Sequence, residues 1–239
     1  MNVQEAVLKT VGLLGGMSWE STQVYYRLLN QGVNRALGKL HSASILLASV
    51  DFEPLQRAQH RDDWDTVRRI LVPAAQQLEG AGAGCLLLAS NTMHRVAPTL
   101  QEALGIPLLH VVDAVGAALA QAGIRKVGLL GTAFTMEQPF YRQRLVDHFG
   151  QTVITPDADD RAWLHGVIFD ELCRGVVSER SKTRLGEVIE RLGKAGAEGV
   201  ILGCTEIGML VDDGEAALPL FDTTVLHAEH AVAWCLGDP

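Results

Sequence analysis

The sequence predicts an α/β protein made of two similar half-domains, each built on a parallel sheet. Short apolar runs alternate along the chain with helix-length amphipathic segments, and two of these segments recur at nearly the same spacing. Apolar residues make up 48% and charged residues 20% of the 239 residues, which is typical of a globular core.

Six apolar runs have the length of buried strands. Because they are apolar without alternation, both faces of the sheet should be covered by helices, as in parallel α/β sheets. Apolar residues at three- and four-residue spacing predict the covering helices. The expected strands are Thr10–Leu14, Ser44–Val50, Cys85–Ala89, Leu108–Val111, Lys126–Leu130 and Gly199–Gly203, and the expected helices include Ser21–Leu37, Trp64–Ala81 and Thr183–Ala195.

The chain repeats itself internally. The run Val11–Gly15 (VGLLG) recurs as Val127–Gly131, an offset of 127 − 11 = 116. Residues 81–92 align with residues 195–206, and Ser90 then falls opposite Cys204, an offset of 204 − 90 = 114. We therefore expect one half-domain from residues 1–108 with 221–239 and another from 109–220, related by a pseudo-twofold axis. Ligands of such sheets bind beyond the carboxyl ends of the strands, so the site is expected in a cleft between the halves.

Composition excludes several classes of function. The net charge of −8 and pI near 5.4 leave no clustered cations for nucleic acid. An uninterrupted apolar run of about 18 residues is absent from the sequence, so a membrane partner is not expected. The N-terminus lacks the basic start of a signal peptide, which predicts a cytoplasmic protein with reduced thiols. The four cysteines are scattered, at Cys85, Cys173, Cys204 and Cys235.

Cys204 is the first candidate catalytic residue. It follows an apolar run and precedes an expected helix, where the helix dipole would lower the thiol pKa from about 8.5 and make it a usable base. The polar neighbours Thr205 and Glu206 favour this interpretation over a buried structural cysteine.

Ser90, the counterpart of Cys204, is followed by polar residues. Ser90 is either a helix cap or a catalytic hydroxyl. Asn91 and Thr92 offer donors to a carboxylate, and His94 orients a catalytic group, donates to the substrate, or is a partly buried first-turn histidine.

Two further turns complete the predicted site. Gly16 and Met17 lie in a glycine turn whose N–H groups would be open to an anion. Thr132 and Thr135 occupy the equivalent place in the second half, as carboxylate donors or helix caps. Thr135 is expected to cap a helix beginning at Met136.

The common cofactor and hydrolase motifs are absent from the sequence. It has no G-x-G-x-x-G, Walker A, G-x-S-x-G or H-E-x-x-H motif. None of its five lysines lies in a pyridoxal-phosphate motif, and His227 with His230 lacks an evident third ligand, so no cofactor or metal is expected. His227 and His230 are predicted to lie on a partly exposed helix.

At these same residues the sequence resembles the aspartate/glutamate/hydantoin racemase superfamily, and within it the aspartate racemase branch. The resemblance covers nearly the whole chain. It is carried by Gly15–Thr22 with Tyr25-Tyr26, Asn91-Thr92-Met93-His94, Gly131-Thr132 with Thr135–Gln138, Gly203–Ile207 and Phe221–Thr224.

The resemblance implies two α/β domains with the active site between them, a homodimer, and racemisation of an amino acid without pyridoxal phosphate or metal. One residue removes the α-proton and its counterpart reprotonates the opposite face; here these are Cys204 and Ser90. The resemblance also places substrate carboxylate and ammonium near Asn91, Thr92, Thr132, Thr135 and Thr205.

The sequence departs from the family pattern at two places. Many members carry cysteine at both catalytic positions, whereas Ser90 is a poor base at neutral pH, so proton removal should be efficient on the Cys204 face only. Trp163 stands where dicarboxylate-specific relatives carry lysine, with Arg161 and His165 as candidate substitutes for that cation. A broader racemase, a one-cysteine decarboxylase or isomerase, and a non-catalytic amino-acid-binding protein are the alternatives.

Overall fold

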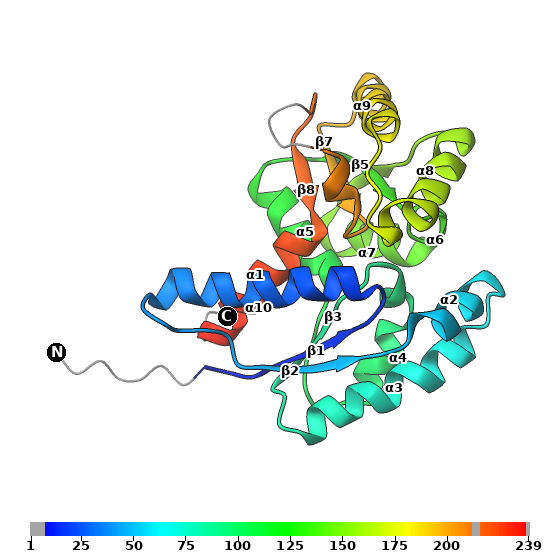
Figure 1. Ribbon diagram of the computed structural model, residues 1–239. Helices are drawn as coiled ribbons and strands as arrows, with labels where there is room; N and C mark the ends of the chain where they lie inside the picture. The colour runs from blue at the N-terminus through cyan, green and yellow to red at the C-terminus, as the bar shows by residue number, and fades with distance from the viewer. Residues whose placement is uncertain (1–7, 212–215, 238–239) are drawn as a thin grey trace. The chain divides into compact units, whose positions relative to one another are not determined.

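The computed structural model describes residues 8–211 and 216–237 (Figure 1). It forms two compact units, the first from the described residues within 1–110 and 227–239, and the second from those within 111–226. Each unit holds a four-stranded parallel sheet with helices packed on it.

The first unit carries strands β1 to β4 in the order β2-β1-β3-β4. Leu13 at the middle of β1 lies between Leu47 of β2 and Leu87 of β3. The strands are β1 (Val11–Gly15), β2 (Ile45–Ser49), β3 (Cys85–Leu88) and β4 (Leu108–Leu109). The helices are α1 (Trp19–Leu37), α2 (Phe52–His60), α3 (Trp64–Gly80), the 3₁₀ turn η1 (Thr92–Val96), α4 (Ala97–Glu102) and, from residue 227, α10 (Thr223–Leu236).

The second unit repeats this strand order as β6-β5-β7-β8, which is the duplication that the sequence repeat indicated. Its strands are β5 (Lys126–Gly131), β6 (Thr152–Ile154), β7 (Gly199–Gly203) and β8 (Leu220–Asp222). The helices are α5 (Val111–Gln121), α6 (Ala133–Glu137), α7 (Pro139–Phe149), α8 (Ala158–Asp170) and α9 (Glu179–Lys194), with 3₁₀ turns η2 (Leu172–Arg174) and η3 (Ile207–Leu210).

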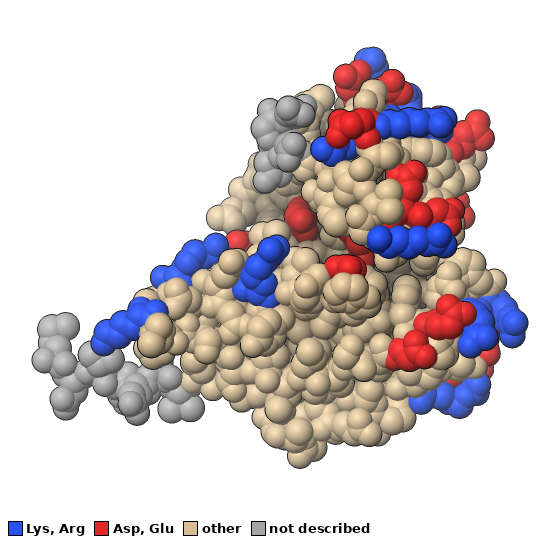
Figure 2. All heavy atoms as spheres, in the orientation of Figure 1, with Lys and Arg blue, Asp and Glu red and all other residues tan. Residues whose placement is uncertain are grey.

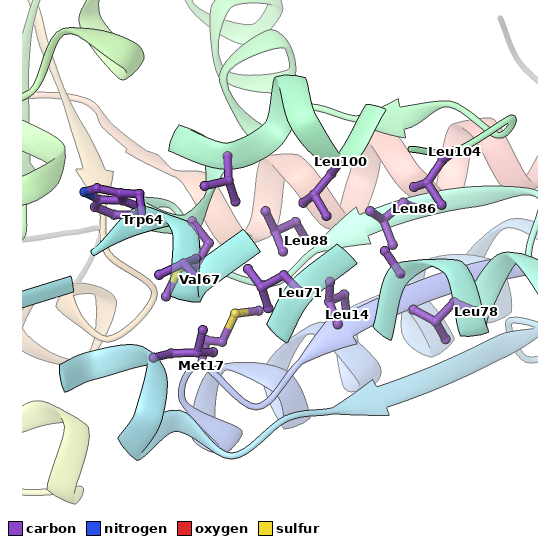
Figure 3. Close-up of a cluster of buried hydrophobic side chains, with 14 of the residues drawn as sticks. Leu14, Met17, Trp64, Val67, Leu71, Leu78, Leu86, Leu88, Leu100 and Leu104 are labelled. Carbon is purple, nitrogen blue, oxygen red and sulfur yellow. The ribbon is translucent and has the colours of Figure 1, made fainter. Parts of the chain in front are cut away.

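The side chains of successive strand residues pack in hydrophobic cores on opposite faces of the sheet, because strand side chains alternate between faces. In the first unit, Leu14 and Leu88 pack with Leu71 of α3 and with Met17 on one face (Figure 3). On the other face Leu13 packs with residues of α1 and α10. Both faces of the sheet are therefore covered at the inner strands β1 and β3, as the uninterrupted apolar strands predicted.

The predicted fold class is confirmed, with differences at strand ends. All six expected strands are present, and Gly199–Gly203 has the predicted bounds. Strands β6 and β8 were not expected, and Val111 begins α5 instead of ending a strand. Among the described residues, helices with the length and apolar character needed to cross a membrane are absent.

Candidate active site

Cys204 lies directly after β7, at the carboxyl end of an inner strand of its sheet. The Cys204 Sγ donates to Glu206 Oε2 at 3.0 Å, and the Thr205 hydroxyl donates to the same oxygen at 2.6 Å. Glu206 is buried, while Cys204 and Thr205 keep partial exposure. The carboxylate is thereby held against the thiol by the residue between them.

The pKa of the Cys204 thiol is shifted in the direction opposite to that expected from the sequence. Burial raises the pKa of the Cys204 thiol well above its ordinary value, and the negative charge of Glu206 and the nearby Cys173 raise it further. The expected helix is only the 3₁₀ turn η3, so a long helix dipole is not available to stabilise a thiolate. The prediction of a lowered thiol pKa was therefore wrong.

Ser90 occupies the equivalent place after β3 in the first unit. Its Oγ accepts a long hydrogen bond of 3.4 Å from the Met93 N–H, and its carbonyl oxygen accepts from His94 Nδ1 at 2.7 Å. Asn91 and Thr92 follow it and are buried at the start of η1. The structure thus combines a weak capping role for Ser90 with a fixed orientation for His94.

His94 belongs to a buried cluster that sequence reasoning did not identify. Its ring lies 4.5 Å from that of His110 and 5.6 Å from that of His227, measured between ring centroids. His227 Nε2 lies 2.7 Å from the Leu109 carbonyl oxygen and so donates to it, which leaves Nδ1 to accept from the Tyr25 hydroxyl at 3.0 Å. His227 and His230 both lie on α10, which is partly exposed as predicted: His230 is exposed, whereas His227 is fully buried. The sequence contains no spacing signal that joins residues 94, 110 and 227.

The glycine turn at Gly16 serves the fold more than a ligand. A side chain at Gly16 would collide with the Val50 backbone, and its φ of +90° favours glycine. The Gly16 N–H donates to Thr22 Oγ1 at 2.8 Å, which corrects the expectation that it is open to an anion. The Met17 side chain is buried in the core against α3 (Figure 3).

Thr132 and Thr135 lie together at the carboxyl end of β5. Thr132 caps α6, because its Oγ1 accepts from the Thr135 N–H at 3.3 Å. The hydroxyls of the two threonines are also 3.3 Å apart, and both residues are buried. The helix begins at Ala133, so the prediction that Thr135 caps a helix starting at Met136 was wrong.

The cations proposed to replace a missing lysine already have partners within the second unit. Arg161 donates to Glu137 at 2.9 Å and to the Pro156 carbonyl oxygen at 2.7 Å. His165 Nδ1 accepts from the Ala133 N–H at 3.2 Å, so this nitrogen carries no proton. Trp163 packs on the core around β7 and lies under the Arg184 guanidinium, 4.5 Å from its ring centroid.

A metal centre is not evident in residues 8–211 and 216–237. A group of three or more histidine, cysteine, aspartate or glutamate side chains suited to hold an ion is absent from them. The predicted site residues thus fall into two groups, with Ser90, Asn91, Thr92 and His94 in the first unit and Cys204, Thr205, Glu206, Thr132 and Thr135 in the second.

The Asp/Glu/Hydantoin racemase family model matches residues 14–231. The chain belongs to this family. Both groups of predicted site residues lie inside the matched range. Relatives of the family are racemases, so the chain falls among the isomerases.

Solved structures and curated relatives agree with the family assignment. The chain is 48% identical to a candidate Asp/Glu racemase from Yersinia pestis, covering 96% of this chain and 100% of that one, with a TM-score of 0.90. An aspartate racemase homologue from Pyrococcus horikoshii is 30% identical over 96% of this chain and 100% of its own, with a TM-score of 0.82. The broad-specificity amino-acid racemase RacX of Bacillus subtilis is 23% identical, over 95% of this chain and 98% of its own length.

Proposed function

We propose that this racemase-family protein racemises an amino acid without a cofactor, with Cys204 as the main base. The observation that carries the proposal is the hydrogen bond from Cys204 Sγ to Glu206 Oε2. A thiol with a raised pKa is protonated at neutral pH and needs an acceptor before it acts as a base. Glu206 is the group placed to accept that proton, a role beyond the substrate contact expected of it.

In the proposed reaction the proton leaves Sγ for Glu206, and the thiolate then removes the α-proton of the substrate. Ser90 donates its hydroxyl proton to the opposite face of the resulting carbanion and regains one from solvent, while Glu206 releases to solvent the proton that it took from Sγ. Asn91, Thr92, Thr132, Thr135 and Thr205 hold the substrate carboxylate and ammonium groups. Because a serine hydroxyl is a poor base, turnover is faster in the direction that starts on the Cys204 face.

Aspartate and glutamate are the first substrates that we propose, in a cytoplasmic homodimer. A second candidate is a broader racemase acting on less polar amino acids. It is favoured by the engagement of Arg161 with Glu137 and by the position of Trp163 under Arg184. A distal carboxylate would have to compete with Glu137 for Arg161.

The test is deuterium exchange at Cα in heavy water, with both enantiomers of Asp, Glu, Ala, Leu and Met. Cys204→Ala should lose exchange by about 10²–10⁴-fold. Cys173→Ala, which removes the neighbouring thiol, is the matched control and should retain exchange. Ser90→Ala should retain exchange from one enantiomer while racemisation slows.

Absence of Cys204-dependent exchange with every amino acid would refute the racemase proposal and leave the non-catalytic alternative. Faster exchange with Ala, Leu or Met than with Asp and Glu would refute the dicarboxylate proposal and support the broader enzyme. Loss of CO₂ in place of exchange would indicate the decarboxylase.

A further inference from the structure

Strand β2 ends its sheet with one side unpaired. The Ser44 carbonyl oxygen accepts from Val11 at 2.9 Å, and the Val50 N–H donates to Gly15 at 3.0 Å. Backbone groups of alternate strand residues point to opposite sides, so the even-numbered residues face β1. The N–H and C=O groups of Ile45, Leu47 and Ser49 therefore point away from the sheet, and the structure gives them no hydrogen-bond partner among the described residues.

This edge lacks the protection that sheet edges usually carry. Residues 40–50 contain no Lys, Arg, Asp, Glu or Pro. Proteins commonly block exposed edges with charges, prolines or very short strands, because unpaired strands bind other chains. The other three terminal strands, β4, β6 and β8, are two or three residues long, whereas β2 has five. Its central residue, Leu47, is 49% exposed.

Two exposed aromatic side chains lie on the α1 surface that borders β2. Trp19 and Tyr26 are 64% and 54% exposed and, seven residues apart, share one helix face. Asn30, one turn beyond Tyr26 on that face, accepts from the Ala43 N–H at 3.1 Å, just before β2. In the view of Figure 2 the surface over β2 is uncharged. Tyr and Trp beside an uncharged edge are typical of protein interfaces.

We propose that β2 pairs antiparallel with β2 of a second copy of this chain, across a twofold axis at Leu47. Leu47 then faces the partner's Leu47. Ile45, two residues before the axis, faces the partner's Ser49, two residues after it. The three outward residues of each copy provide about six backbone hydrogen bonds. A strand can always pair with itself in this way, because a twofold interface uses the same surface on both copies.

The charges at the two ends of β2 suit this pairing. Lys39 and His41 precede the strand, and Asp51 and Glu53 follow it. In the antiparallel arrangement the segment before each β2, with Lys39 and His41, lies toward the segment after the partner's β2, with Asp51 and, in the first turn of α2, Glu53. The basic end of each strand thus meets the acidic end of the other, and like charges do not face each other along the paired residues.

Sedimentation or light scattering of the full chain at micromolar concentration tests the pairing. Wild type should be a dimer and Leu47→Lys a monomer, because two lysines would meet on the axis. Leu40→Lys is the matched control: Leu40 is 98% exposed but lies outside the strand, so this variant should stay dimeric. Mixing Leu47→Lys with Leu47→Glu should restore mixed dimers. Circular dichroism of each variant checks folding.

Hydrogen exchange of wild type locates the interface without any substitution. The amides of Ile45, Leu47 and Ser49 should exchange slowly in the dimer and at least tenfold faster on dilution to monomer. A monomeric wild type, a folded Leu47→Lys that stays dimeric, or unprotected outward amides would each overturn the proposal. The readouts are independent of racemase activity, so failure of the proposed function leaves this inference intact.

Discussion

Burial and the Glu206 carboxylate together limit the reactivity of the Cys204 thiol. The carboxylate accepts the thiol proton at 3.0 Å and opposes a negative charge on sulfur. These two effects, added to burial, keep Cys204 protonated in the resting protein. The same carboxylate is also the described group placed to accept the thiol proton. It therefore lowers the reactivity of the resting thiol and supports the proposed reaction.

Glu206→Gln should therefore change thiol reactivity and catalysis in opposite directions. Without the carboxylate charge the pKa of Cys204 falls toward its ordinary value, so alkylation by iodoacetamide at pH 8 should become several-fold faster. Racemisation should fall about 10²-fold, since the proton acceptor is lost. Peptide mass spectrometry assigns the alkylated cysteine, and Cys204→Ala gives the background. If alkylation and racemisation both become faster, or both become slower, this role of Glu206 is contradicted.

Tyr25 and Tyr26 provide a matched pair at adjacent positions. Tyr25→Phe removes the hydroxyl that donates to His227 Nδ1 and leaves that buried nitrogen without this donor. The loss should cost about 1–2 kcal/mol in unfolding free energy. Tyr26→Phe, on the exposed face of α1, should leave it unchanged. Urea titration followed by tryptophan fluorescence measures both; equal stabilities would refute a structural role for the Tyr25 hydroxyl.

At the scale of elements, α8 and α9 are joined through one buried carboxylate. Asp160, in the first turn of α8, accepts from Arg191 at 2.6 Å and from Arg184 at 3.3 Å, both on α9. Arg184 in turn covers Trp163, so the ion pairs also fix that ring. Asp160 is 5% exposed, whereas both arginines are partly solvated.

Asp160→Asn should destabilise the second unit by about 1–3 kcal/mol, because three charged hydrogen bonds from two arginines are weakened and a buried polar side chain remains. Glu187→Gln removes the long, exposed pair between Glu187 and Arg191 and is the control, with an expected effect below about 0.5 kcal/mol. Thermal unfolding of both variants provides the comparison. A Glu187→Gln effect as large as that of Asp160→Asn would show that burial of Asp160 is not decisive.

Long, buried elements were predicted from the sequence, whereas the short and partly exposed strands β6 and β8 were not. The strand Gly199–Gly203 is a buried apolar run between turns, and its bounds were predicted correctly. Strands β6 and β8 have three residues each, with intermediate or exposed side chains, and such segments show neither an apolar run nor an alternation. Val111 extends an apolar run but lies in α5, because the strand ends after Leu109 and tertiary packing overrides the local pattern.

For the whole molecule, the sequence repeat predicted the duplicated strand order. The repeated segments form β1 and β5, and β3 and β7, which occupy the same positions in their two sheets. The site was predicted as a set of segments but not as a set of interactions. Spacing cannot show that the Glu206 carboxylate turns to Cys204, or that His227 joins His94 across more than a hundred residues. The thiol pKa was predicted in the wrong direction because burial, its largest cause, is a tertiary property.

Burial of the remaining thiols makes global stability depend on pH above neutrality. It raises the pKa of Cys85 and Cys173 to about 12 and that of Cys235 to about 11. In the unfolded chain these thiols ionise near a pKa of about 8.5. Above that pH the unfolded chain has lost protons that the folded chain retains, so the free energy of unfolding falls as pH rises.

The loss is at most about 1.4 kcal/mol per pH unit for each thiol, and less for the partly exposed Cys173. Urea midpoints at pH 7.5, 8.5, 9.5 and 10.5, measured with a reductant, should be level up to about pH 8.5 and then decline. Cys85→Ala lowers stability at every pH because it leaves a cavity. Above pH 8.5 its urea midpoint should fall less steeply than that of wild type, because one ionising thiol has been removed. If the wild-type midpoint stays constant to pH 10.5, or the variant keeps the full slope, the buried thiols are not the cause.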